Sequence, residues 1–274
     1  MLIDFHTHTT ASDGALCPSA LLERARERGV QVLAITDHDT LRGFHEASTL
    51  VPPDVRLVSG VEISCMWSGV PIHVVGLDFD ANDPGVRDIG QALLRVRDER
   101  AERIAARLAE RGMAGGLEGA RRIAGDAALC RPHFAQWMVE AGHVDTVNKA
   151  FAKWLGRGKP GDVKAAWPHL SDIVGIVRSA GGLAILAHPL KYGLTRTKLR
   201  ALCEAFAGCG GSAIEVVNGL QSAEEVARLR RLARDFDLAA SLGSDFHRDS
   251  PYGADLGVCP SLAGEVPSIL EQML

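Results

Sequence analysis

Residues 2–8 read Leu2-Ile3-Asp4-Phe5-His6-Thr7-His8, a short apolar run that predicts a strand followed by two histidines. Strand alternation places His6 and His8 on the same face. They stand at the carboxyl end of the expected strand, where parallel α/β folds hold their active sites. Because two imidazoles on one face can chelate one ion, this stretch predicts both the fold class and a metal site.

Short apolar runs recur along the chain, and helical patterns lie between them. The other expected strands are Val32–Ile35, Val55–Val61, Ile72–Leu77, Leu183–Ala187, Ala213–Val217 and Ala239–Leu242. The expected helices include Ser19–Arg28, Ser171–Ala180 and Ser222–Asp235, the last with a capping box of Ser222 and Glu225. This alternation predicts an α/β fold with a mainly parallel sheet or barrel.

The strand pattern stops between Leu77 and Leu183, a gap far longer than one crossover helix requires. The gap begins with a long helical run from Pro84 to Arg111 and ends near the Gly- and Lys-rich residues 156–161. We therefore expect residues 1–80 and 165–274 to form the two parts of a barrel. Residues 81–164 are expected to form an inserted helical cap domain.

Composition limits the class of protein. A hydrophobic content of 46% in 274 residues excludes global disorder. Residues 84–164 hold 15 Lys and Arg against 10 Asp and Glu, whereas the rest of the chain is acidic and the whole carries a net charge of −4. A basic region beside a carboxylate-rich one suits a metal site that handles an anion.

The cysteines, at positions 17, 65, 130, 203, 209 and 259, form no Cys-x-x-Cys pair and have no zinc-finger spacing. We expect ordinary thiols in a reducing cytoplasm. The first residues resemble no signal peptide, and no run approaches the roughly 18 apolar residues of a membrane span. A cytoplasmic location without a membrane partner is expected.

Histidines and carboxylates recur where the expected strands end. The nine candidate ligands are His6, His8, Asp13, His38, Glu62, His73, His188, Asp245 and His247. One tetrahedral ion needs only three or four protein ligands, so nine nitrogen and oxygen ligands predict two or three ions. A single histidine at a strand end is more often structural, and the remaining histidines at 45, 133, 143 and 169 keep that interpretation apart from His133.

The same motifs resemble the polymerase-and-histidinol-phosphatase (PHP) superfamily. They are Asp4–His8, Ser12–Gly14, Thr36–Thr40, Gly60–Glu62, Ala187–Pro189 and Gly243–His247. The resemblance implies a distorted seven-stranded (β/α) barrel and a cluster of two or three divalent ions, with Mn most expected and Fe or Zn as alternatives. It assigns His6, His8, Glu62 and Asp245 to one ion, Asp13, His38 and His247 to a second, and Glu62, His73 and His188 to a third.

Within this ligand set, Asp13, Glu62 and Asp245 are the candidate catalytic residues. Glu62 is expected to bridge ions, because its two carboxylate oxygens can serve two ions whereas a neutral imidazole offers one lone pair. Clustered divalent ions activate water and offset the charge that develops on a phosphate ester. The expected activity is therefore metal-dependent phosphoester hydrolysis.

A narrower resemblance concerns the substrate. Cys130-Arg131-Pro132-His133 and the later Ala180–Pro189 resemble nucleoside 3′,5′-bisphosphate phosphatases and related 5′-to-3′ exoribonucleases. Residues 161–167 depart from that branch, which leaves the role of Lys164 open. The expected substrate-binding residues are Ser12, Arg97, Arg100, Arg131, His133 and Lys164.

The leading interpretation is removal of the 3′-phosphate from a nucleoside 3′,5′-bisphosphate, with hydrolysis of short 5′-phosphorylated RNA at the same site. Alternatives are another small phosphomonoesterase, such as a histidinol-phosphate phosphatase, and a non-catalytic PHP module. With 5% aromatic residues and a negative net charge, the sequence favours small nucleotides or short oligoribonucleotides over long single strands. It leaves the metal, the oligomeric state and the preference between mononucleotide and RNA open.

Overall fold

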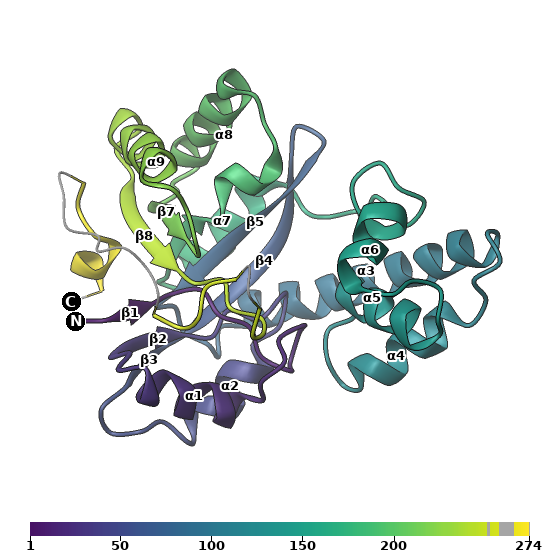
Figure 1. Cartoon of the computed structure of the whole chain (residues 1–274). Helices are drawn as coiled ribbons and strands as arrows, with labels where there is room; N and C mark the ends of the chain where they lie inside the picture. The colour runs from purple at the N-terminus through teal and green to yellow at the C-terminus, as the bar shows by residue number, and fades with distance from the viewer. Residues whose placement is uncertain (251–252, 258–265, 274) are drawn as a thin grey trace.

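The computed structural model describes residues 1–250, 253–257 and 266–273. Its strands are β1 (Ile3–Asp4), β2 (Val32–Ala34), β3 (Arg56–Val58), β4 (Gly60–Trp67), β5 (Val70–Leu77), β6 (Leu183–Leu186), β7 (Ala213–Asn218) and β8 (Ala239–Gly243). Its α-helices are α1 (Pro18–Glu27), α2 (Arg42–Ser48), α3 (Pro84–Ala109), α4 (Gly116–Ala124), α5 (Arg131–Glu140), α6 (Val147–Ala150), α7 (Leu170–Ser179), α8 (Arg196–Gly208) and α9 (Ala223–Asp235). Short turns of π-helix and 3₁₀-helix are η1 (Phe151–Leu155), η2 (Pro189–Tyr192) and η3 (Ile269–Gln272). The chain thus has the expected mixed α/β fold (Figure 1).

Two sheets form the body of the molecule. One has the order β1-β2-β3 and is parallel throughout, and the other has the order β4-β5-β6-β7-β8. In the second sheet, β5 runs antiparallel to both β4 and β6, whereas β6, β7 and β8 are mutually parallel. Most strand pairs are therefore parallel, as the alternation of strands and helices predicts.

The single strand expected at Val55–Val61 is wrong, because the chain divides there into β3 and β4, which belong to different sheets. Gly60 lets the start of β4 pass close to the end of β2, since a Cβ atom at this position would lie 2.7 Å from the carbonyl oxygen of Ile35. After β4, Ser68 and Gly69 both have positive φ and join β4 to β5. Such a two-residue turn is typical of an antiparallel hairpin, which the prediction of a mainly parallel sheet did not include.

Backbone hydrogen bonds connect the two sheets at two places. The Phe5 amide donates to the carbonyl of Leu242, at 3.2 Å, which links β1 to β8. The Asp39 amide donates to the carbonyl of Glu62, at 2.9 Å, which links the end of β2 to β4. The ends of these strands are thereby held close together.

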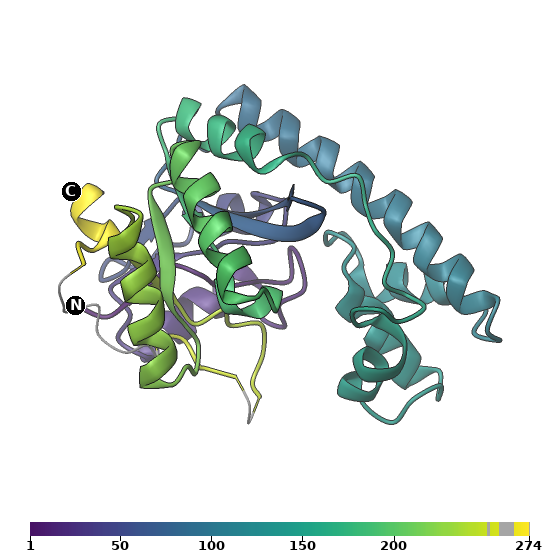
Figure 2. The same cartoon turned by 90° about the horizontal axis from the view of Figure 1, so that it is seen from above.

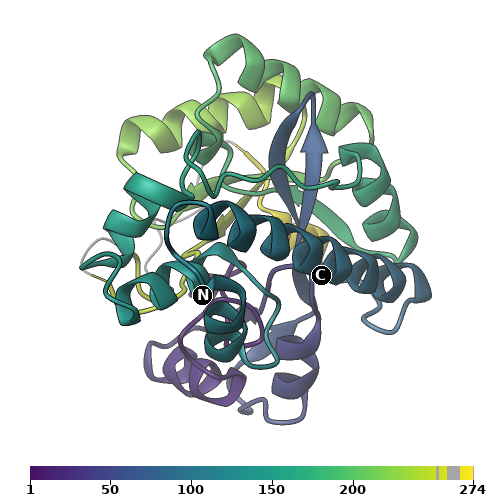
Figure 3. The same ribbon diagram turned by 90° about the vertical axis from the view of Figure 1, so that its right-hand side faces the viewer.

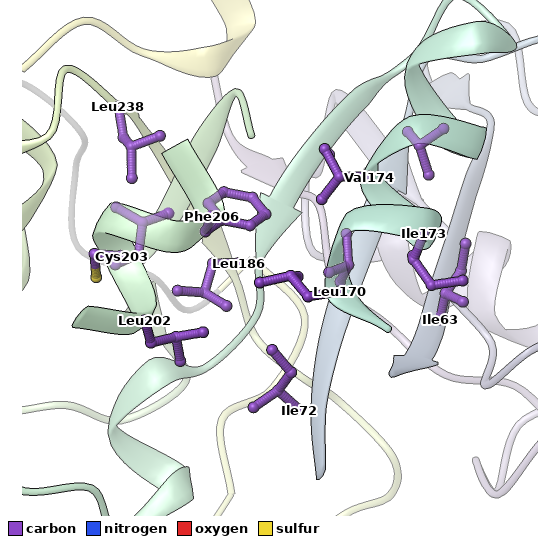
Figure 4. Packing of buried hydrophobic residues seen from close by; sticks show 14 of the residues in the cluster. Ile63, Ile72, Leu170, Ile173, Val174, Leu186, Leu202, Cys203, Phe206 and Leu238 are labelled. Atoms are coloured by element: carbon purple, nitrogen blue, oxygen red, sulfur yellow. The ribbon is translucent and has the colours of Figure 1, made fainter. Parts of the chain in front are cut away.

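Apolar side chains fill both faces of the larger sheet. Figure 4 shows α7 and α8 facing this sheet through Leu170, Ile173, Val174, Leu202, Cys203 and Phe206, which meet Ile63, Ile72 and Leu186. A separate cluster takes side chains from both sheets, among them Val32, Val75, Ile185 and Ala239, and Ile269 of η3 joins it. Burial of these apolar groups on both faces is the main term that stabilises the body of the fold.

The helical run expected from Pro84 to Arg111 is α3, which begins at Pro84 behind an N-cap at Asp83. At 1.5 Å per residue its 26 residues extend roughly 39 Å. Its first half packs with the sheet cluster through Val86 and Leu93, and its second half packs with α4–α6 in a different cluster through Ile104 and Leu108. Figure 2 shows α3 leading from the sheets to this group of helices, and Figure 3 shows it crossing in front of the sheets.

Two further sequence expectations concern the cysteines and the membrane. The described cysteines, at 17, 65, 130, 203 and 209, are free thiols, while Cys259 lies outside the described residues. Among the helices of the described residues, none is long and apolar enough to cross a membrane.

Candidate metal centre and active site

The nine candidate ligands gather at one end of the two sheets. Their places are His6 and His8 after β1, Asp13 in the next loop, His38 after β2, Glu62 in β4, His73 in β5, His188 after β6, and Asp245 and His247 after β8. They form four overlapping groups whose possible ligand atoms lie within 4.8 Å of one another. The groups are His8, Asp13, His38 and His247; His6, Glu62 and His188; His6, His8 and Asp245; and His38, Glu62 and His73.

The backbone turns sharply where two of these side chains enter the site. His188 and Asp245 have φ values of 28° and 54°, a region that non-glycine residues seldom adopt. Gly243 lets β8 approach the first strand, because a Cβ atom there would lie 2.2 Å from the Cβ of His6. Strain of this kind concentrates at functional sites, where the surrounding structure holds it in place.

Glu62 lies in the middle of the cluster. Its Oε1 is 2.7 Å from Nε2 of His188 and 2.8 Å from Nδ1 of His73, while its Oε2 is 2.8 Å from Nδ1 of His38 and 3.5 Å from Nε2 of His6. The expectation that Glu62 closes a strand is wrong, since it stands near the start of β4. The antiparallel hairpin brings Glu62 and His73 together, because β4 and β5 pair Ser64 with His73.

Two other carboxylates surround the histidines of the first strand. Asp13 Oδ1 lies 3.4 Å from Nε2 of His247 and 3.9 Å from Nδ1 of His8. Asp245 Oδ1 lies 3.2 Å from Nε2 of His8 and 3.5 Å from Nε2 of His6. His8 thus faces carboxylates on two sides, an arrangement that suits cations placed between them.

Several buried atoms of the cluster form no hydrogen bond within the described residues. They include Nε2 of His6, both ring nitrogens of His8, Oδ1 of Asp13 and Nδ1 of His188. Buried polar atoms are normally hydrogen-bonded, so this concentration is unusual for a protein core. Ligation of a cation would satisfy these lone pairs, and a set of imidazoles and carboxylates without thiolate suits Mn, Fe or Zn. The residues present therefore fit a cluster of divalent ions.

The charges of the cluster favour ligation. Burial, with His247 and His38 nearby, lowers the pKa of His8 to about 3, so its imidazole is neutral at pH 7, the form that binds metals. Burial opposes ionisation of Glu62, but the imidazoles of His73 and His38 outweigh it and hold the pKa of Glu62 well below its usual value. An ionised carboxylate thus stands among groups that can donate lone pairs to a cation.

Glu215, which the sequence analysis missed, supports two of the ligands from β7. Its Oε1 lies 2.6 Å from Nδ1 of His6, and its Oε2 accepts from the backbone N–H of His188 at 2.5 Å and from the amide of Asn218 at 3.0 Å. Glu215 is 1% exposed. A carboxylate on Nδ1 fixes the tautomer that leaves Nε2 of His6 free to ligate. The pattern of an acidic residue inside a buried strand is the signal that could have found it.

We expect Glu215→Gln to weaken manganese binding about ten- to a hundredfold. The Gln amide has one oxygen and one NH₂ group in place of two carboxylate oxygens. Its NH₂ group would therefore face another N–H donor, either Nδ1–H of His6 or the backbone N–H of His188. Calorimetric titration of the metal-free protein with Mn²⁺ measures the change, and Glu204→Gln, on the exposed face of α8, is the matched control. Unchanged affinity in a folded Glu215→Gln protein would contradict this role.

Asp37, also missed, holds the loop that carries Asp13. Its carboxylate accepts from the amide of Thr9 at 2.7 Å and from the hydroxyls of Thr9 and Ser12, each at 2.6 Å. Ser12 was expected to bind substrate, but its hydroxyl hydrogen is directed to Asp37. The structure thus places Ser12 beside the cluster with its donor already engaged.

The expected substrate-binding residue Arg97 is turned inward from α3. Its Nε lies 2.7 Å from Oδ2 of Asp39, and its other nitrogens donate to Ser64 Oγ at 3.1 Å and to Cys130 Sγ at 3.0 Å. Arg97 is 5% exposed and Asp39 is 1% exposed. This network joins α3 and the start of α5 to β4, so Arg97 connects the helical segment to the sheets.

Of the other expected cations, Arg100 lies close to Arg97, whereas Lys164 is exposed. The guanidinium carbons of Arg97 and Arg100 lie 5.6 and 5.8 Å from the ring centre of Trp167. Burial, together with Arg131 and Arg97 nearby, lowers the pKa of Arg100 to about 10. Arg97 and Arg100 thus lie at the same aromatic ring, and Arg97 also donates to Cys130, the residue before Arg131.

His133 lies in the first turn of α5, close to the loop of Asp13. Its Nδ1 accepts the backbone N–H of Cys130 at 3.0 Å. It lines a cleft of about 220 Å³ together with Ser12, Asp13 and Arg248. His133 therefore lies near the ligand cluster, on the side where the helical segment approaches it.

η2 adds two side chains that the sequence analysis did not select. Lys191 forms an ion pair with Asp245 through Oδ2. The hydroxyl of Tyr192 donates to the carbonyl of Ala187 at 2.8 Å and accepts from the amide of His73 at 2.9 Å. Their position three and four residues after His188 is the signal that could have found them.

Comparison with known proteins agrees with this geometry. The PHP domain family matches residues 4–82. The chain is 41% identical over 255 residues to the 5′-3′ exoribonuclease Rnm of Escherichia coli, which covers 92% of this chain and 87% of that protein. It is 37% identical over 257 residues to the 3′,5′-nucleoside bisphosphate phosphatase of Chromobacterium violaceum, which covers 93% and 90%.

A solved structure has the same fold. It is an amidohydrolase from Chromobacterium violaceum with bound sulfate and no metal, and it superposes with a TM-score of 0.93 at 35% identity. The match covers all of this chain and 96% of that one. The helical segment and the sheets are therefore both present in that relative.

Proposed function

The chain belongs to the PHP family, and from this premise we propose that it is a metal-dependent phosphoesterase that removes the 3′-phosphate from nucleoside 3′,5′-bisphosphates and also hydrolyses short 5′-phosphorylated RNA. One observation carries the proposal: nine imidazole and carboxylate residues converge on one site with buried lone pairs unsatisfied. The names of the relatives from Escherichia coli and Chromobacterium violaceum support the substrate class. The sulfate in the solved relative supports binding of a tetrahedral anion.

The cofactor of this proposal is two or three divalent ions, with manganese preferred over iron or zinc. His6, His8 and Asp245 would hold one ion, Asp13, His38 and His247 a second, and His73 and His188 a third, with Glu62 shared. When bound, such ions activate water and neutralise charge on a phosphate ester. Asp13, Glu62 and Asp245 supply the negative charge that retains them, which is why we propose these three as the residues on which turnover depends.

The chain itself positions the ester. Glu215 and Asp37 fix the orientation of His6 and of the Asp13 loop, so the site is arranged before substrate binds. Lys191, beside Asp245, adds a cation at the rim of the cluster. The ester is then cleaved when water attacks phosphorus, and the nucleoside 3′-oxygen leaves with a proton.

The second phosphate of a bisphosphate needs cations outside the cluster. Arg100 and Arg131 are the proposed partners, together with Arg97 and His133. Three guanidiniums held close together repel one another, and an anion between them would relieve that repulsion. Ser12 and Lys164 stay weaker candidates, because Ser12 donates to Asp37 and Lys164 is exposed.

Arg131→Ala should lower kcat/KM for adenosine 3′,5′-bisphosphate roughly ten- to a hundredfold, the size expected for one charge-assisted hydrogen bond. Hydrolysis of an aryl phosphate, which has no second phosphate, should change much less. Arg131→Lys should restore only part of the loss, because a point charge cannot reproduce the planar guanidinium. An equal loss on both substrates would mean that Arg131 stabilises the fold or acts at the reaction centre, and does not bind the second phosphate.

We also propose that the strands form a distorted barrel and that residues 81–164 form a cap domain inserted into it. The hydrogen bonds that join β1 to β8 and the end of β2 to β4 support the barrel. An inner apolar cluster drawn from both sheets supports it too. The separate cluster among α3–α6 supports the cap.

We place this activity in the cytoplasm, in line with the free thiols of the described cysteines. The substrate class is tested by comparing kcat/KM of the manganese-loaded protein on adenosine 3′,5′-bisphosphate, histidinol phosphate and 5′-phosphorylated dinucleotides. The proposal predicts that the bisphosphate is the best of the monoesters. A higher value for histidinol phosphate would replace it with the alternative of another small phosphomonoesterase.

A further inference from the structure

A polar cleft opens beside the ligand cluster, between the loop of residues 10–15 and helices α4 and α5. Its volume is about 220 Å³, and it reaches Asp13 at one end. Its lining includes Ile123, Ala127, Pro132, Gln136 and Arg248. One wall therefore comes from the helical segment and the other from the loop that follows the first strand.

The two walls are fixed to each other. The backbone N–H of Ala128 donates to the carbonyl of Ala11 at 3.0 Å, and Arg42 donates to the carbonyl of Asp126 at 2.6 Å. Asp37 holds the loop from behind, through Ser12. The cleft is thus a formed feature of the fold and lies next to the group of Asp13, His38 and His247.

The chemistry of the proposed function calls for a place of this kind. In a nucleoside 3′,5′-bisphosphate and in 5′-phosphorylated RNA, the bond broken is the same one, between phosphorus and the 3′-oxygen of the first nucleoside. Water adds its oxygen to phosphorus, the electron pair of the broken bond passes to the 3′-oxygen, and that oxygen takes a proton. The substrates differ only because RNA carries a second nucleoside on another oxygen of the same phosphate. That nucleoside must occupy space beside the ligand cluster.

We propose that this cleft binds the nucleotide on the 3′ side of the cleaved phosphate and thereby gives the enzyme its activity on RNA; the inference rests on the proposed function. Ile123, Ala127 and Pro132 offer an apolar surface to a base, and the Gln136 amide offers both a donor and an acceptor to its edge. Arg248 donates to the carbonyl of Asp13 at 3.1 Å and is otherwise exposed, so its guanidinium is oriented at the mouth. A cation there suits the next phosphate of the strand.

The test compares two substrates in two variants. Ala127→Trp fills the cleft from a loop position, and Arg248→Ala removes the cation at its mouth. For each, kcat/KM is measured on a 5′-phosphorylated trinucleotide, for release of its first nucleotide, and on adenosine 3′,5′-bisphosphate; the trinucleotide carries a phosphate after the second nucleoside, where Arg248 is proposed to bind. We expect the ratio of the first value to the second to fall at least tenfold in both variants. Arg196→Ala, an exposed arginine on α8, is the matched control and should leave the ratio unchanged.

The outcomes separate this inference from the proposed function. If the unaltered enzyme hydrolyses both substrates but the ratio stays the same in Arg248→Ala and in a folded Ala127→Trp protein, the cleft does not bind the second nucleotide. The inference also fails if the unaltered enzyme hydrolyses the bisphosphate and not the trinucleotide, although the phosphatase function then stands. If it hydrolyses neither, the proposed function itself is overturned. Circular dichroism of each variant establishes that it is folded.

Discussion

Replacing Glu62 with Gln is expected to lower turnover of adenosine 3′,5′-bisphosphate by several orders of magnitude while the fold persists. The reason is the position of this carboxylate among His188, His73, His38 and His6, all within 3.5 Å of its oxygens. The amide has nearly the same shape but carries no charge and has one acceptor oxygen in place of two. It cannot serve two ions, so the cluster should lose both affinity and arrangement.

Three measurements make this prediction specific. Turnover is determined with saturating manganese, bound metal is counted after gel filtration, and thermal unfolding reports the fold. Glu204→Gln, an exposed carboxylate on α8, controls for the loss of one negative charge. Turnover close to that of the unaltered protein in Glu62→Gln would remove Glu62 from the reaction centre. Asp245→Asn is expected to behave like Glu62→Gln, because Asp245 lies 3.2 Å from His8 and 3.5 Å from His6.

The second large effect concerns stability. Asp39→Asn should lower the free energy of unfolding by about 3 kcal/mol, because it leaves the buried guanidinium of Arg97 without its anion. Asn tolerates the positive φ of 56° found at this position, so the substitution changes charge with little change in backbone preference. Turnover should fall much less than in Glu62→Gln, since Asp39 belongs to none of the four ligand groups.

Urea unfolding of the single variants and the double variant separates the ion pair from its surroundings. Arg97→Met should also destabilise the protein, but Asp39→Asn combined with Arg97→Met should be more stable than the sum of the single losses predicts. Additive losses would show that the two side chains act independently. That result would favour the interpretation that Arg97 serves only to bind substrate.

The ligand cluster could be predicted because its signals are local. His6-Thr7-His8 follows one short strand and Asp245-Phe246-His247 follows another, and parallel neighbours carry such positions to the same edge. The long helix from Pro84 was equally visible, since its buried positions recur at helical spacing from Val86 to Leu108. In both cases neighbouring residues in the sequence are enough to predict the local structure.

The contacts of the supporting residues could not be predicted, even where a buried acidic residue such as Glu215 could be noticed, because their partners are distant in sequence. Glu215 forms a hydrogen bond with His6, which lies 209 positions away, and no local sequence pattern indicates that these two residues are partners. Arg97 looks like any arginine on a solvated helix until Asp39 is placed against it. The Ser68-Gly69 turn was a local hairpin signal, but the run of apolar residues around it was assigned to separate parallel strands.

The most direct test of the central claim is a titration of metal-free protein with Mn²⁺ in the presence of adenosine 3′,5′-bisphosphate, with the products followed by phosphorus NMR. The account predicts no turnover without metal and a rate that continues to rise beyond one equivalent of manganese, with adenosine 5′-monophosphate and inorganic phosphate as products. Full activity at one equivalent or less, activity that survives chelation, or release of the 5′-phosphate instead would contradict it.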